Sequence, residues 1–233
     1  MTHSVHAVAR PGWAAAFLLM GLLGFSACRG GPEADDEPRP AVSYESVAAL
    51  RAEGAARFLT TDAELAELET AVAALDSSGQ AAARPRLDAL RGARSSLQSR
   101  LDSLDATRFA SLAAFDTLAA DLRQRIDALD AAIARDRVLI LPDAASLRAY
   151  AAARLSAVAE AASRRRADST RSAIREAAGL DSARVQIERQ LTALGSPTVR
   201  YDSLRDVIAV GFADLRRLQR DTLAARFRPD SLR

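Results

Sequence analysis

The sequence predicts an all-α protein, folded as an elongated antiparallel coiled-coil hairpin with additional shorter helices. Apolar residues make up 49% of the 233 residues and aromatic residues only 5%. Ala, Leu, Arg, Asp and Glu dominate, a composition typical of long helices, whereas a β-rich chain would carry more Val, Ile, Tyr and Thr. Apolar residues also recur at heptad spacing from Leu87 onward. A compact helical bundle of five or six helices is the alternative.

The heptad pattern forms one long apolar seam. With Leu87 as position a, most a and d positions up to residue 122 are large and apolar: Leu87, Leu90, Leu97, Leu101, Leu104, Phe115, Leu118 and Leu122. Arg94 and Arg108 are polar a positions, of the kind that can set register or partner choice. Ile126, Leu129 and Ile133 continue the seam after a four-residue phase shift, which is a stutter. Such a seam requires a second helix packed against it.

Pro142 predicts where the chain folds back. Proline cannot continue a helix and disfavours helical dihedrals in the residue before it, so we expect a turn near 138–142. The stretches 86–137 and 143–194 on either side are equally long, about 80 Å each if unbroken. Folding back near residue 140 would pair Ile133 with Leu147 and Leu122 with Val158. Helix breaks near 105–108 and at Gly179 would instead produce the compact bundle.

Shorter helices are expected on both sides of the hairpin. One covers about 46–58, and a second begins at the capping-box pattern Thr61-Asp62-Ala63-Glu64 and ends at Gly79. Gly195-Ser196-Pro197 reads as a helix stop, an N-cap and a first-turn proline. The last helix carries its apolar stripe at Leu204, Ile208, Leu215 and Leu218.

The first 27 residues have the pattern of a secretory signal peptide. Residues 1–12 are polar with Arg10 as their firm charge, and residues 13–27 are apolar and uncharged. The apolar run is shorter than the roughly 20 residues of a comfortable membrane span. We therefore expect 1–27 to be cleaved.

The end of this segment, Phe25-Ser26-Ala27-Cys28, resembles the lipobox of bacterial lipoproteins. Ser26, Ala27 and Cys28 match it position by position, while Phe25 stands where Leu is commonest. The resemblance implies that Cys28 becomes the first residue and receives a diacylglycerol group and a further acyl chain such as palmitate. Two other interpretations are an uncleaved anchor helix and a disulfide between two chains.

Residues 28–43 are expected to form a flexible lipidated tether, since Gly, Pro and charged residues leave little to bury. The helical domain then covers 44–233. By resemblance to lipoprotein sorting rules, Arg29 after the cysteine implies an outer membrane location facing the periplasm. Asp35, Asp36 and Glu37 resemble a surface-export signal, although solvated linker charge is the preferred interpretation.

Removal of 1–27 would leave Cys28, which is assigned to the lipid, as the only one of the usual catalytic and metal-binding His, Cys and Lys side chains. His3, His6, Met1, Met20 and Trp13 are the only His, Met and Trp residues, and there is no Lys. General bases, nucleophiles and metal ligands come mostly from His, Cys and Lys, so we predict no catalytic residue, cofactor or metal, and no enzyme. Glycan cleavage by paired carboxylates is the enzymatic alternative, but the acidic residues occupy solvent-facing heptad positions or helix ends.

Charge gives little reason to expect a nucleic-acid partner. The formal net charge is +2, and 1–27 contains Arg10 and no acidic residue, so the cleaved chain would carry +1. The basic stretch Arg164-Arg165-Arg166 with Arg171 and Arg175 is read as a solvated helix face, supported by Glu160 four residues before Arg164. A patch for an anionic lipid, polymer or protein is the other interpretation.

These patterns favour a membrane-anchored, non-enzymatic helical lipoprotein that acts as a scaffold, spacer or docking element in the cell envelope. A protein partner, or self-association through the helices, is expected. A chaperone-like holdase for envelope proteins is the alternative. The absence of Lys excludes a covalent peptidoglycan link through a C-terminal Lys.

Overall fold

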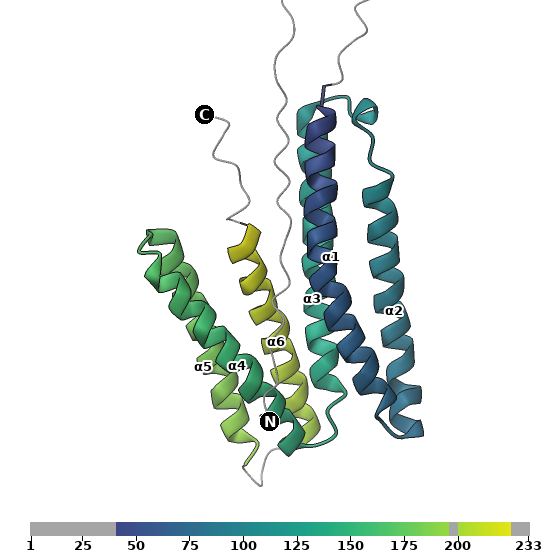
Figure 1. Ribbon diagram of the computed structural model, residues 1–233. Helices are drawn as coiled ribbons and strands as arrows, with labels where there is room; N and C mark the ends of the chain where they lie inside the picture. Colours follow the sequence, from purple (N-terminus) through teal and green to yellow (C-terminus); the bar gives the residue numbers. More distant parts are fainter. Residues whose placement is uncertain (1–40, 196–199, 225–233) are drawn as a thin grey trace, which may run out of the picture. The chain divides into compact units, whose positions relative to one another are not determined.

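The computed structural model describes residues 41–195 and 200–224, with side chains up to residue 219. Within this part the chain forms six α-helices, one short 3₁₀ helix and no strand (Figure 1). The elements are α1 (Tyr44–Ala73), α2 (Ser77–Asp102), η1 (Ala106–Arg108), α3 (Leu112–Leu139), α4 (Ala144–Ala167), α5 (Arg171–Ala193) and α6 (Tyr201–Ala224). The all-α prediction is confirmed, and six helices match the bundle alternative.

Polar N-cap side chains start five of the helices. In each case the cap accepts a hydrogen bond from the backbone N–H three residues further on, which satisfies a donor that has no partner inside the helix. The caps are Ser43 for α1, Asp76 for α2, Ser111 for α3, Asp143 for α4 and Thr170 for α5. The sequence therefore encodes the helix starts locally.

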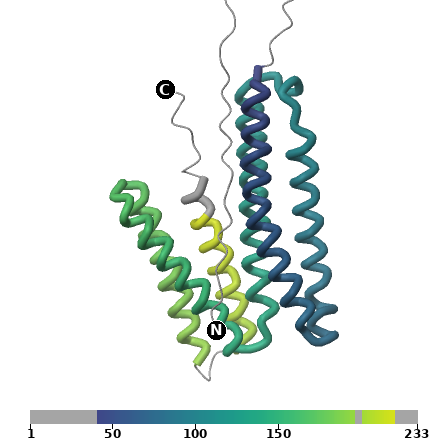
Figure 2. The backbone as a smooth tube through the Cα atoms, viewed as in Figure 1, coloured from purple at the N-terminus to yellow at the C-terminus, as the bar shows by residue number. Residues whose placement is uncertain are grey.

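Successive helices run in opposite directions, so α1 and α3 are parallel (Figures 1 and 2). The first three helices pack against one another, α4 packs on α5, and α5 packs on α6. The most extensive packing joins α3 to α6, which lie far apart in the sequence. This pair connects the two sets of three helices.

The buried apolar side chains fall into two clusters that follow the same division. One cluster runs from Val42 through α1, α2 and α3 to Ile140. The other contains Val138 and the inner faces of α4, α5 and α6, including Leu147, Phe212 and Leu215.

The structure corrects the arms of the predicted hairpin. The helix expected over 86–137 is interrupted between Asp102 and Leu112, because Asp105 caps η1 through the Thr107 N–H and Ser111 caps α3. Arg108, a predicted a position, is exposed there. The break near 105–108 lies where the bundle alternative placed it.

The turn lies close to its predicted place, since α3 ends at Leu139 and α4 begins at Ala144. The helices that it joins do not pair as expected: α3 packs along α6, while α4 packs along α5. Ile133 and Leu147, the predicted neighbours, belong to different apolar clusters. Ala119 and Ala131 are buried as well, so α3 buries a wider face than its large seam residues indicated.

The predicted boundaries within α1 and α2 also need correction. The pattern at Thr61 does not start a helix, because α1 is continuous through this residue. The Thr61 hydroxyl instead lies 2.7 Å from the Asp130 carboxylate of α3 and 3.2 Å from the Arg57 carbonyl oxygen of α1 itself. Gly79 lies in the first turn of α2 rather than at a stop. Pro85 lies inside α2, on an exposed side where water can satisfy the carbonyl that loses its donor.

The break in the second arm lies at 168–170, before the predicted position at Gly179. Ser169 adopts a left-handed conformation with φ 55°, and Thr170 then caps α5. Gly179 is an ordinary position inside α5. Of the predicted Gly195-Ser196-Pro197 signal, 196 and 197 lie outside the described residues; α5 ends at Ala193 and α6 begins at Tyr201.

Candidate functional site

The site residues predicted from the sequence lie outside the described residues. The signal peptide 1–27, the motif Phe25, Ser26 and Ala27, and the acylation site Cys28 all precede residue 41. In the described part, no helix is both long and apolar enough to cross a membrane. The same residues contain no group of three or more His, Cys, Asp or Glu side chains that could hold a metal ion.

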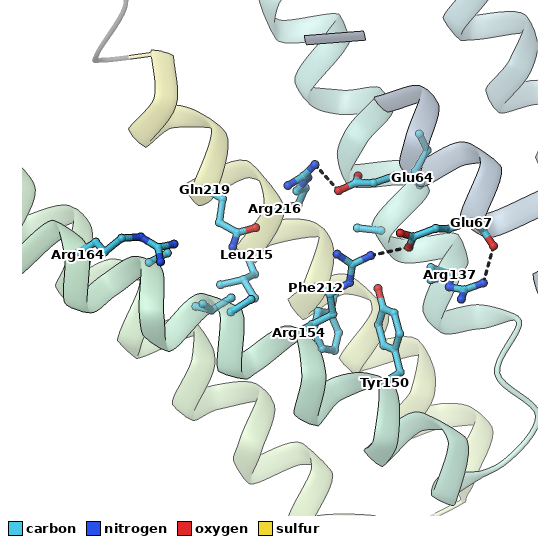
Figure 3. A pocket seen from close by; sticks show the side chains of 15 residues that line it. Glu64, Glu67, Arg137, Tyr150, Arg154, Arg164, Phe212, Leu215, Arg216 and Gln219 are labelled. Carbon is cyan, nitrogen blue, oxygen red and sulfur yellow. Dashed lines mark hydrogen bonds and ion pairs between the residues drawn. The ribbon is translucent and has the colours of Figure 1, made fainter. Parts of the chain in front are cut away.

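A pocket of about 290 Å³ lies between α1, α3, α4 and α6 (Figure 3). Ile133, Val158, Phe212 and Leu215 form much of its apolar wall. Its charged wall consists of four arginines and two glutamates: Arg137, Arg154, Arg164, Arg216, Glu64 and Glu67. The pocket therefore combines an apolar surface with an excess of cationic side chains.

Helical periodicity explains how the four helices supply this wall. Side chains three or four residues apart lie on one helix face, which is the spacing of Glu64 and Glu67 on α1 and of Tyr150 and Arg154 on α4. Ala157, Val158 and Ala161 continue that face of α4, and Phe212, Leu215, Arg216 and Gln219 occupy the matching face of α6. The spacing is local, but the meeting of the four faces depends on the fold.

Both glutamates of the pocket are engaged by arginines from other helices. The Arg216 guanidinium of α6 pairs with the Glu64 carboxylate, and Nη2 of Arg154 lies 3.1 Å from Glu67 Oε2 (Figure 3). These pairs hold α4 and α6 against α1. They also neutralise the two negative charges of the wall.

Arg137 differs from these arginines. Its Nη1 donates a 2.9 Å hydrogen bond to the backbone carbonyl oxygen of Glu67, and its Nε is buried with no acceptor among the described residues. No carboxylate in the described part lies within ion-pair distance of Arg137. Nε of Arg216 is likewise buried without an acceptor there, although its terminal nitrogen is paired. Buried donors of this kind cost free energy unless an acceptor is supplied.

Tyr150 connects the charged and apolar walls. Its ring packs edge-on against Phe212, with centroids 5.5 Å apart, and the Cζ atoms of Arg137 and Arg154 lie 6.0 and 5.7 Å from its centroid. Its hydroxyl points towards the Arg154 and Glu67 side chains (Figure 3). Burial raises the pKa of Tyr150, so the hydroxyl is protonated at neutral pH and can donate a hydrogen bond.

A second polar feature joins α1 to α3 and runs from the partly exposed Glu53–Arg123 pair to the fully buried Thr61–Asp130 pair. Arg123 contacts Glu53, Arg57 pairs with Asp127 at 3.0 Å, and Thr61 bonds to Asp130. Successive pairs are 70, 70 and 69 residues apart, a nearly constant offset that fixes the register of two parallel helices. Since each side chain of this ladder contacts a partner on the other helix, the ladder is structural.

The basic stretch at the end of α4 is only partly the solvated face that was predicted. Arg164 is exposed and pairs with Glu160. Arg165 is 8% exposed and contacts Glu176 of α5 at 3.6 Å, while Arg166 pairs with Asp181. The two ion pairs to α5 hold the α4–α5 hairpin together, which leaves less free charge for an anionic partner.

No protein-family model, curated protein or solved structure matches this chain significantly. Its function must therefore be inferred from its own residues.

Sequence reasoning did not single out the pocket. Tyr150 is one of three tyrosines in the chain, and it carries Arg154 four residues later on the same face. That pair was the available local signal, because neither residue belongs to the buried seam of α4, which contains Leu147, Leu155 and Val158. Arg137 and Phe212 reach the same place only through the packing of α3 and α6.

Proposed function

We propose that this chain is a lipid-anchored, non-enzymatic helical protein of the bacterial cell envelope that docks or spaces a partner. The observation that carries the proposal is the motif Phe25-Ser26-Ala27-Cys28 at the end of an apolar, uncharged stretch. Its likeness to the lipobox gives a defined role to Cys28, the one cysteine of the sequence. Arg29 in the following position favours the outer membrane, with the helices facing the periplasm.

The anchor would act through the acyl chains on Cys28. Each buried CH₂ contributes about 0.8 kcal/mol, so several chains on one residue give a stable attachment where one chain would be marginal. Residues 28–41 would then tether the helical domain to the bilayer, since Val42 already packs in its apolar core and Ser43 caps α1. Fourteen residues span at most about 50 Å when fully extended, which allows the domain to act away from the membrane surface.

The described surface supports docking in preference to holding unfolded chains. Its exposed large apolar side chains are scattered over four helices: Tyr44, Leu59, Leu112, Ile174, Val207 and Val210. A holdase requires a broad apolar surface, whereas scattered single residues are normal on any folded protein. Ion pairs between helices, such as Arg91 with Glu69 and Arg94 with Asp62, favour a domain of fixed geometry.

Metabolic labelling with palmitate in a bacterial host tests the anchor. We expect the label in the chain, and we expect the chain in the membrane fraction. Cys28→Ser should abolish labelling and retain the uncleaved precursor, whereas the matched change Ser26→Ala should leave both unchanged, since Ala is accepted at that lipobox position. Equal labelling of Cys28→Ser and the unchanged chain would refute the proposed acylation site.

Light scattering separates docking from chaperone activity. An unfolded outer-membrane protein is diluted into buffer with or without the full chain. We expect the same aggregation of the unfolded protein with and without the chain. Suppression at equimolar ratio would favour the holdase alternative instead.

A further inference from the structure

We propose that the pocket between α1, α3, α4 and α6 binds a small molecule that carries one carboxylate on an apolar body. This site is independent of Cys28 and of the lipid anchor. The proposal rests on the charge balance of the pocket wall, the buried guanidinium donors and the apolar surface beside them.

The charge balance favours an anionic ligand. Glu64 and Glu67 each pair with an arginine, whereas Arg137 donates its hydrogen bond among the described residues to a neutral backbone carbonyl and otherwise lies beside the uncharged Tyr150 ring. A cation partly removed from water without a counter-charge is unfavourable. A ligand carboxylate beside Arg137 would supply that counter-charge, and a ligand cation would add to the existing excess of positive charge.

Hydrogen-bond donors at the same place favour a carboxylate. The guanidinium of Arg137 presents a planar set of N–H groups that matches two carboxylate oxygens. The Tyr150 hydroxyl lies close to this wall, as its ring is beside both Arg137 and Arg154 (Figure 3). Together these groups can bind a carboxylate without the help of a metal ion.

The remaining surface sets the size and polarity of the rest of the ligand. Ile133, Val158, Phe212 and Leu215 are apolar, and Ala157 and Ala161 leave room beside them. The volume of about 290 Å³ is near the lower end for small-molecule pockets, which start at roughly 300 Å³. A short aliphatic or aromatic acid fits this space, whereas a phospholipid is too large.

Three ligands with the same apolar body test the proposal by isothermal titration calorimetry on the full chain. We expect 4-phenylbutanoate to bind with one-to-one stoichiometry. We expect 4-phenylbutan-1-ol to bind about tenfold more weakly, because it lacks the charge-assisted hydrogen bonds, and 4-phenylbutylamine to bind more weakly still. Equal affinities for the three, tighter binding of the amine, or no saturable binding of the acid would overturn the proposal.

Two pairs of matched variants locate the binding site. Arg137→Gln should weaken 4-phenylbutanoate about tenfold and remove the preference over the alcohol, whereas Arg135→Gln, an exposed arginine on the same helix outside this pocket, should have no effect. Ala161→Leu should block the apolar part and weaken both acid and alcohol, whereas Ala153→Leu, exposed on the same helix, should not.

These two pairs make the assignment independent of any one variant. Circular dichroism melting of each variant establishes that it is folded before titration. If Arg137→Gln and Ala161→Leu both bind the acid as the unchanged chain does, the ligand lies elsewhere and the proposed site is wrong. Because Cys28 is intact in every variant, this result leaves the proposed anchor unaffected.

Discussion

The hydroxyl of Thr61 on α1 donates a 2.7 Å hydrogen bond to the carboxylate of Asp130 on α3, and both side chains are fully buried. This bond belongs to the ladder that continues through Arg57 with Asp127 and Glu53 with Arg123. Two parallel helices with apolar faces could slide by a turn, but displacement of this ladder would leave buried polar groups without partners. The polar ladder therefore specifies the α1–α3 register.

Thr61→Val should destabilise the protein by about 1–3 kcal/mol, because it keeps the side-chain shape but removes a donor to a buried carboxylate. Urea unfolding would measure this as a lower midpoint with an unchanged slope. Thr70→Val is the control, since Thr70 makes a similar hydrogen bond to the carbonyl four residues before it, at an exposed position of the same helix. A control change as large as that of Thr61→Val would mean that the Asp130 contact contributes nothing specific.

Two glycine substitutions should change stability in opposite directions. Gly179→Ala should stabilise the protein by about 0.5–1 kcal/mol, because alanine favours a helix and a Cβ there meets nothing within 4 Å. At Gly54 a Cβ would collide with Cδ1 of Leu101, which is only 2% exposed. The resulting overpacking costs about 1–3 kcal/mol, so Gly54→Ala should be destabilising. Thermal unfolding of both variants compares the signs directly, and a stabilised Gly54→Ala would show that α1 and α2 are not in such close contact.

The cap of α4 should produce a measurable pH dependence. The backbone N–H of Ser146 holds the pKa of Asp143 below its usual value of 3.8. A carboxylate whose pKa is lowered by folding stabilises the fold above its unfolded pKa, and this contribution is lost as the pH falls through the folded pKa. Asp143→Asn keeps a capping oxygen without titrating, so its melting temperature should fall less between about pH 5 and pH 2. An identical decline in both proteins would rule out a contribution from this cap.

NMR titration of the side-chain carboxyl carbons tests two pKa shifts that are expected to have opposite signs. Burial raises the pKa of Asp136 on α3, in contrast to the lowered pKa of Asp143. The Asp136 resonance should therefore titrate above 3.8 and the Asp143 resonance below it. Reversed order would contradict the partly buried position of Asp136 beside α2 and α6.

Local sequence signals predicted the all-α class and much of the buried seam, but they misplaced several helix boundaries and did not identify all the helix partners. Ile126, Leu129 and Ile133 are buried as the shifted heptad pattern indicated. The break at 105–111 was visible in the weak stretch of the seam, and the capping residues Asp105 and Ser111 explain it. A heptad pattern requires a partner helix without naming it, and the sequence offered no local preference for α6 over α4 as the partner of α3.

The pocket could not be predicted from local sequence patterns, for the same reason. Arg137, Tyr150 and Phe212 come from three helices, and only the contact between α3 and α6 brings them together. Arg94 shows a related limit of prediction from the sequence. As a polar a position it was expected to influence register, and the structure adds that it bonds to Asp62 and lies over the Phe58 ring at 4.1 Å.

Intact-mass analysis of the chain isolated from bacterial membranes tests most directly whether this is a lipoprotein. We predict a mass for residues 28–233 increased by a diacylglyceryl group and an amino-terminal acyl chain on Cys28. A chain that still begins at Met1, or one with an unmodified Cys28 thiol, would remove the basis for placing these helices in the cell envelope.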